Sequence, residues 1–198
     1  MILLNPKNHY GLDDYAYWED FLTEDDIRFL QYHPSLLNAN SAEIGGQSKD
    51  RSQDLNIRRT NVGWLDFSIE NKHIWDKISN VVAEVNSKFF HINLTGFYEY
   101  MQLSEYSASF QGHYNWHTDG SKLDKNVPRK LSMVLMLSDP SEYEGGELQI
   151  KTGEENTTLE MKQGRAWFFP SYMLHRVTPV TKGIRKTAVL WVGGEPWQ

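Results

Sequence analysis

The sequence predicts a mainly β protein with flanking helices: an antiparallel β-sandwich or jelly roll over residues 93–194, supported by an N-terminal α/β layer over residues 1–92. Three observations lead to this fold class. After residue 93, β-type segments separated by turn residues recur about every ten residues. Before it, two stretches have the apolar spacing of helices. With 39% hydrophobic and 13% aromatic residues, residues 1–198 have the composition of a single folded domain.

Two helices are expected in the N-terminal layer. The stretch from Thr23 to Asp26 has the pattern of a capping box, with Asp in place of the usual Glu, and predicts a helix near residues 24–32. A second helix is predicted near residues 71–88, where apolar residues recur at helical spacing: Ile74, Trp75, Ile78, Val81, Val82 and Val85.

The C-terminal part of the chain contains the expected strands. Their approximate ranges are 96–106, 130–139, 145–152, 157–163, 165–171, 174–180 and 184–192. Residues 131–137 are apolar on both strand faces, which indicates a strand buried on both sides. A turn at Thr181–Gly183 should separate the last two strands.

The composition excludes several classes of site and partner. The chain has no Cys, so any metal must be held by nitrogen and oxygen ligands. A formal net charge of -6 argues against a nucleic-acid partner, because the phosphate backbone requires a basic surface. The first apolar run is too short for a signal peptide, and there is no apolar span of about 18 residues. We therefore expect no membrane association and a cytoplasmic location, and the oligomeric state stays open.

A candidate metal site lies in the stretch HYNWHTDG, residues 113–120. His117 and Asp119 are two positions apart, so on an extended chain their side chains leave on the same face. His175, in a distant β-type segment, is the leading candidate for a third ligand. Two imidazoles and one carboxylate on one side of a metal form the facial arrangement of non-haem Fe(II) oxygenases. A pair of this kind also occurs in exposed turns, and the same residue types can hold zinc. His113 is expected to be a bystander.

Arg185 decides between these alternatives. It lies ten residues after His175 at the head of an otherwise apolar strand, where an inward-facing charge is costly unless it is paired. Alternation places Arg185, Thr187, Val189 and Trp191 on one strand face. An inward guanidinium beside a metal could bind a dicarboxylate through two parallel hydrogen bonds. The alternative is a solvent-exposed arginine on an edge strand.

The motif HTDG, the later LHRVTPV and the strand that carries Arg185 together resemble the Fe(II)/2-oxoglutarate-dependent oxygenases of the prolyl-4-hydroxylase-like branch. The resemblance covers roughly residues 95–193, includes the GGEL turn and implies a double-stranded β-helix, or jelly roll, core. It implies that His117, Asp119 and His175 hold Fe(II), and that Arg185 binds the distal carboxylate of 2-oxoglutarate, with O2 as the other co-substrate. It also implies co-substrate contacts for three aromatic residues, namely Tyr106, Tyr114 and Trp191.

Two positions depart from the collagen-type members of that branch. Those enzymes have lysine where this chain has Arg185, and some relatives have a tyrosine where this chain has Met136. The resemblance implies hydroxylation of a prolyl residue in a peptide or protein. The same chemistry on a free amino acid or another small molecule, or a jelly-roll binding module without turnover, are the alternatives.

The substrate contacts are the least determined part of the prediction. Residues 38–56 are rich in Asn, Ser, Gly and charge and predict a long exposed loop or weak hairpin, of the length from which active-site lids are drawn. Residues 121–130 could flank the same opening, and Trp116 could reach it. A basic rim around the site is a further possibility, formed by Arg58, Arg59, Lys122, Lys125, Arg129 and Lys130.

Overall fold

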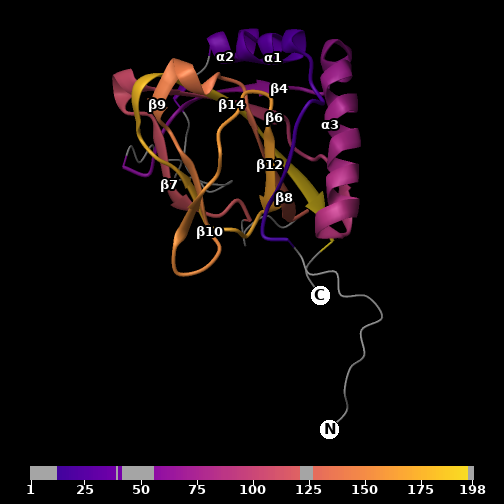
Figure 1. Cartoon of the computed structure of the whole chain (residues 1–198). Coiled ribbons are helices and arrows are strands. Elements are labelled where there is room, and N and C mark those ends of the chain that lie inside the picture. The colour runs from indigo at the N-terminus through magenta and orange to yellow at the C-terminus, as the bar shows by residue number, and fades with distance from the viewer. Residues whose placement is uncertain (1–12, 39, 42–55, 121–126, 196–198) are drawn as a thin grey trace, which may run out of the picture.

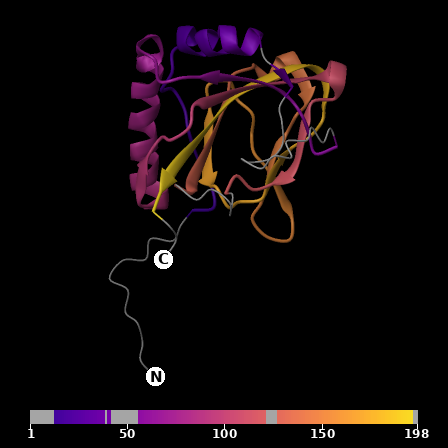
Figure 2. The same cartoon turned by 180° about the vertical axis from the view of Figure 1, so that it is seen from behind.

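Two antiparallel β-sheets face each other in the computed structural model, which describes residues 13–38, 40–41, 56–120 and 127–195. Helices α1 and α2 run across the top of the molecule and α3 runs down one side, away from β7 and β10 (Figures 1 and 2). The arrangement confirms the predicted jelly roll with flanking helices. Among the described residues, no helix combines the length and the apolar character that a membrane span requires.

The larger sheet, here called the major sheet, has the order β1-β12-β8-β14-β6-β4-β2, with β5 and β9 also paired to β14. Its strands are β1 (Ala16–Trp18), β2 (Asn40–Ser41), β4 (Asn61–Leu65), β5 (Leu94–Gly96), β6 (Met101–Ser107), β8 (Arg129–Met136), β9 (Tyr143–Gly145), β12 (Ala166–Pro170) and β14 (Val180–Gly194). The minor sheet has the order β11-β10-β13-β7-β3. Its strands are β3 (Arg58–Arg59), β7 (His113–His117), β10 (Leu148–Lys151), β11 (Asn156–Thr158) and β13 (His175–Val177).

Both predicted helices form, and the structure adds a short one that the sequence analysis did not predict. Helix α1 (Glu24–Gln31) begins with the expected capping box, in which the Thr23 and Asp26 side chains bond each other's backbone N–H. Helix α2 (Pro34–Leu37) is a single turn. Helix α3 (Lys72–Val85) buries the six apolar residues of the predicted face and continues into a π-helical turn at Asn86–Phe90. Short 3-10 turns cover Ile69–Asn71, Ala108–Phe110 and Pro140–Glu142.

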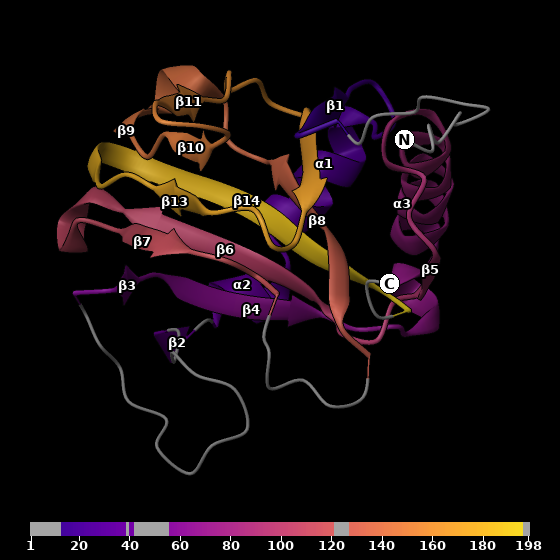
Figure 3. The same cartoon turned by 90° about the horizontal axis from the view of Figure 1, so that it is seen from below.

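Strand alternation divides the core into two layers. On β14, Ala188 and Leu190 face the helices, whereas Val189 faces the minor sheet. On β12, Phe168 and Phe169 divide in the same way. Seen from below, β7 and β13 lie side by side at the opposite end of the molecule from α3 (Figure 3). Side chains between the two sheets therefore come from both, and this layer contains the candidate site.

Two expectations for connecting segments have different outcomes. The predicted turn at Thr181–Gly183 is wrong, because β14 runs without interruption from Val180 to Gly194. Gly183 has φ +70° and still pairs with Tyr143 of β9; the ladder with β9 is irregular one step earlier, between Val180 and Lys182, and β14 then pairs with β6. The predicted loop at residues 38–56 lies mostly outside the described residues.

Candidate metal centre

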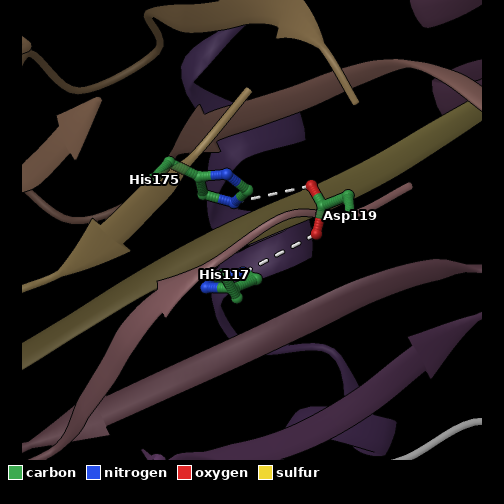
Figure 4. Close-up of side chains that lie close together, drawn as sticks. All are labelled: His117, Asp119 and His175. Atoms are coloured by element: carbon green, nitrogen blue, oxygen red, sulfur yellow. Dashed lines mark ion pairs between the residues drawn. The ribbon is translucent and has the colours of Figure 1, made fainter. Parts of the chain in front are cut away.

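His117, Asp119 and His175 come together on the inner side of the minor sheet. His117 ends β7 and His175 begins β13, and the two are cross-strand partners. Asp119 follows two residues after the end of β7. One ligand atom from each residue lies within 4.8 Å of the others (Figure 4). Nitrogen and oxygen donors at this spacing fit one metal ion of the iron or zinc type.

Backbone contacts orient both imidazoles in the same way. The Nδ1 atom of His117 lies 2.8 Å from the carbonyl oxygen of Asn115. That of His175 lies 2.9 Å from the carbonyl oxygen of Met173. Because a carbonyl oxygen can only accept, Nδ1 carries the proton in each ring and the lone pair lies on Nε2. Both rings thus present Nε2 to the third residue, as metal-ligating histidines do.

The Asp119 carboxylate faces both rings. Its Oδ1 lies 3.7 Å from Nε2 of His117 and its Oδ2 lies 3.5 Å from Nε2 of His175. Oδ2 also accepts a hydrogen bond of 2.8 Å from Ser132, whose hydroxyl lies 2.9 Å from that of Ser171. Burial acts to raise the pKa of Asp119, but the two histidines, the indole of Trp191 and the Ser132 hydroxyl outweigh it and hold the pKa below its ordinary value.

His117 is kept neutral at physiological pH. Burial is the main cause that lowers the pKa of His117 to about 4, and the adjacent His175 contributes in the same direction. Only a neutral imidazole can donate its lone pair to a metal. The protein therefore holds this ligand in the form that binds a cation without first losing a proton.

Tyr114 covers His117 from the minor sheet. The two rings stack with centroids 3.5 Å apart and an interplanar angle of 13°. On a regular strand, residues three positions apart would lie on opposite faces. The two intervals of β13 from His175 to Val177 oppose three intervals of β7, from His117 to Tyr114. This irregularity in the ladder brings both rings to one face.

Arg185 lies on the facing major sheet and is fully buried. Its Cζ atom lies 5.1 Å from the centre of the Tyr106 ring, its cross-strand partner on β6. Its Nη2 is 3.7 Å from the sulfur of Met136, whereas Nε and Nη1 have no hydrogen-bond partner among the described residues. Burial lowers the pKa of Arg185. A buried guanidinium with unused donors fits the carboxylate of a small molecule.

Two hydroxyl groups lie beside this guanidinium, and sequence reasoning gave neither of them a role in the site. Thr187 shares the face of Arg185, and its buried Oγ1 has no partner within the described part of the chain. The Tyr143 hydroxyl at the start of β9 lies close enough to Arg185 to raise the pKa of the arginine, and it also has no conventional hydrogen bond there. Strand alternation had already placed Thr187 on the face of Arg185, whereas no local pattern marks Tyr143.

Trp191 lies on the same face of β14, closer to the metal ligands. Its buried Nε1 has no hydrogen-bond partner within 3.5 Å in the described residues, yet it is near enough to Asp119 to lower the pKa of that carboxyl group. The guanidinium of Arg129 lies over its ring, 3.7 Å from the centroid. Arg129 is in turn ion-paired with Glu99.

Other residues named from sequence lie away from the triad. His113 is outside the ligand cluster, and its ring nitrogens face the carbonyl oxygens of Gln111 and Asn56. Trp116 does not reach the site, because alternation turns it to the outer face of the minor sheet, where its ring packs 4.7 Å from the Arg176 guanidinium.

Among the described residues of the predicted basic rim, three do not contribute free charge to a solvent-exposed patch. Arg58 and Lys130 are buried, and Arg129 is paired with Glu99. Lys122 and Lys125 lie outside the described residues.

Comparisons with known proteins agree with this geometry. Residues 101–193 match the family model of the 2OG-Fe(II) oxygenase superfamily. A PKHD-type hydroxylase from Synechococcus sp. (strain JA-2-3B'a(2-13)) is 42% identical over 82 residues, which cover 40% of this chain and 37% of that relative's length.

Two solved structures show the same fold. A Pseudomonas putida prolyl-4-hydroxylase has a TM-score of 0.70 at 18% identity, with 92% of this chain and 94% of that chain covered. A prolyl hydroxylase from Trichoplax adhaerens, in complex with a hypoxia inducible factor oxygen degradation domain peptide fragment, has a TM-score of 0.69 at 16% identity. That comparison covers 91% of this chain and 84% of the other.

A jelly roll that joins two histidines and one carboxylate beside a buried arginine is the framework of a non-haem iron oxygenase. Residues 101–193 of this chain thus resemble the 2OG-Fe(II) oxygenase superfamily, and the fold resembles that of prolyl-4-hydroxylases. The family implies Fe(II), 2-oxoglutarate and O2, and the His-Asp-His cluster fits an iron site.

Proposed function

We propose that this chain is an Fe(II)- and 2-oxoglutarate-dependent dioxygenase that hydroxylates prolyl residues in a peptide or protein and converts 2-oxoglutarate to succinate. The observation that carries the proposal is the pairing of the metal cluster on one sheet with unpartnered Arg185 donors on the other. The similarity to hydroxylases among the relatives and structural neighbours supports the hydroxylase class. A free amino acid or another small molecule is the alternative substrate.

In this proposal, His117, Asp119 and His175 hold Fe(II) by one face and leave its other positions open. Arg185, with the hydroxyls of Thr187 and Tyr143 beside it, binds the distal carboxylate of 2-oxoglutarate. Bound iron with 2-oxoglutarate and O2 supplies the oxidant that inserts oxygen into a C–H bond. The protein fixes the ligands and excludes water from the space between the sheets.

The direct test is succinate formation that depends on both O2 and 2-oxoglutarate. His117→Ala should abolish it, because a ligand is lost, and Arg185→Ala should raise the 2-oxoglutarate concentration required. His113→Ala is the matched control and should retain turnover, since His113 lies outside the cluster. Full activity in His117→Ala would refute the site assignment.

A second measurement separates an enzyme from a binding module that has kept the fold. Anaerobic addition of Fe(II) and 2-oxoglutarate should produce the weak visible charge-transfer band of the chelate. Folded protein that lacks this band would contradict the proposal, and metal binding without succinate release would favour the module. Product masses from a peptide panel, compared with those from free amino acids, identify the substrate class, because hydroxylation adds one oxygen atom.

A further inference from the structure

A second buried arginine lies near the metal cluster, and none of the roles above accounts for it. Arg58 is on β3, the edge strand of the minor sheet, and pairs with Tyr114 on β7. Only 9% of its surface is exposed. Its Nε and Nη2 atoms have no hydrogen-bond partner, and no ion pair involves Arg58 in the described part of the chain. An unpaired buried charge of this kind is costly, so its retention calls for an explanation.

The position of Arg58 relative to His117 follows from the ring between them. Its Cζ atom lies 4.6 Å from the centre of the Tyr114 ring. The imidazole of His117 already covers one face of that ring at 3.5 Å, so the guanidinium lies over the other face. The three side chains form a stack that begins at the ligand cluster and ends at a cation. The charge of Arg58 is close enough to contribute to the low pKa of His117.

A second unused polar atom belongs to the residue two positions after Arg58. Thr60 is 3% exposed, and its Oγ1 has no partner among the described residues. Arg58 and Thr60 are buried, whereas Arg59 between them is half-exposed and donates a long hydrogen bond to the carbonyl oxygen of Phe110. This alternation indicates that Arg58 and Thr60 leave the chain on the same side. Both residues therefore place unpartnered hydrogen-bond donors on that side of the chain.

We propose that Arg58 and Thr60 bind a carboxylate of the primary substrate, beside the metal cluster and separate from the Arg185 region. The proposal rests on the function proposed above and specifies its substrate class. A guanidinium with two free N–H donors fits a carboxylate better than it fits a neutral carbonyl group. The carboxylate can come from an acidic side chain next to the target residue or from the C-terminus of a short substrate.

Charge balance favours an anionic group at this place. The charges of Fe(II) and Arg185 are matched by the Asp119 carboxylate and the two carboxylates of 2-oxoglutarate. Arg129 is matched by Glu99. Arg58 therefore adds one positive charge that these groups leave unmatched. A monoanionic substrate group would neutralise it, whereas a neutral substrate would leave a buried charge unpaired.

The test compares acidic probes with neutral probes of the same shape. One pair is N-acetyl-glycyl-proline and its C-terminal amide. The other is a capped proline peptide with glutamate on either side of the proline, and its glutamine counterpart.

Binding is measured by calorimetry under argon, with protein that carries Fe(II) and 2-oxoglutarate. The acid of at least one pair should bind about 10- to 100-fold more tightly than its neutral partner. The pair that responds identifies the source of the carboxylate.

Arg58→Gln should reduce this acid preference to about one, whereas Arg59→Gln, the adjacent matched control, should keep it. The melting temperature of Arg58→Gln without substrate should equal or exceed that of the wild type, because a buried unpaired charge has been removed; a structural arginine would show the opposite. Equal affinity for acid and amide in both pairs, or a preference that survives in Arg58→Gln, overturns the proposal.

Succinate formation without primary substrate separates a failure of the carboxylate assignment from a failure of the proposed function. Turnover of 2-oxoglutarate that persists in wild type and in Arg58→Gln, together with no acid preference, removes only the carboxylate assignment. Absence of any 2-oxoglutarate-dependent succinate from folded, iron-loaded wild type removes the proposed function itself.

Discussion

The hydroxyl of Ser132 on β8 donates a hydrogen bond of 2.8 Å to Oδ2 of Asp119, so the major sheet holds the carboxylate of the cluster on the minor sheet. Such contacts fix the direction in which a ligand presents its oxygen atoms. Ser132 itself is fully buried and has the Ser171 hydroxyl as its other partner. Ligand orientation therefore depends on how the two sheets are joined as well as on β7 and β13.

Removal of this hydroxyl should weaken metal binding without loss of the fold. In Ser132→Ala we expect the affinity for Fe(II) to fall about 10- to 100-fold, as for other groups that orient metal ligands. Anaerobic metal titration measures it. Ser79→Ala on the exposed side of α3 is the control, and equal affinities in the two variants would contradict the role given to Ser132.

Thr187→Val should shift stability and co-substrate binding in opposite directions. The unpartnered buried hydroxyl costs about 1–3 kcal/mol, so its replacement by a methyl group should raise the melting temperature of the free protein. Loss of a hydrogen bond to bound 2-oxoglutarate should raise its KM about three- to tenfold. Thr181→Val, at an exposed position of the same strand, should leave KM unchanged. An unchanged KM in Thr187→Val would exclude this contact.

Gly146→Ala should displace the Arg185 side chain, because the two residues are distant in sequence but adjacent in the structure. Gly146 has φ +63°, and a Cβ atom there would lie 2.7 Å from Cδ of Arg185 and 2.9 Å from Cγ2 of Val180. We expect a loss of about 1 kcal/mol or more in stability and a higher KM for 2-oxoglutarate. Gly153→Ala meets no atom within 4 Å and is the control. Denaturant unfolding and steady-state kinetics measure the two effects, and identical behaviour of the two variants would be inconsistent with the predicted contact.

Acid should destabilise the metal-free protein through His117. Its pKa is about 4 in the folded chain and 6.5 in its ordinary state, so between these values the unfolded chain binds the extra proton. The free energy of unfolding should therefore fall as pH falls through this interval, by up to about 1.4 kcal/mol per pH unit. Denaturant titrations at several pH values measure the slope. His117→Gln should have a shallower slope, and no change in slope would contradict the low pKa.

The sequence was informative where function depends on strand alternation. The two-residue spacing of His117 and Asp119, and the face shared by Arg185 and Thr187, follow from the period of a β-strand. The capping box at Thr23 likewise predicted the start of α1, because it depends on local backbone groups alone. The roles of these site residues stay predictions until the variants above are measured.

Features that depend on pairing between distant strands could not be read from the sequence. The irregularity that stacks Tyr114 on His117 exists only because β7 pairs with β13 out of step. Gly183 looked like the centre of a turn, but pairing with β9 and β6 keeps β14 continuous through it. Trp116 was misplaced because its neighbours on the outer face come from β13, which is remote in sequence.

The division of the site between two sheets has a consequence for selectivity. The metal ligands belong to the minor sheet and Arg185 to the major sheet. In the proposed function, the distance between the two sheets therefore sets the length of a molecule that can bind to both. Phe169, whose ring lies 4.7 Å from that of His175, is one of the spacers that set this gap. A keto diacid one carbon shorter or longer has the same functional groups, but the spacing between them would not match the spacing between the metal cluster and Arg185. In the proposed function, selectivity for chain length would therefore depend on the packed core between the sheets.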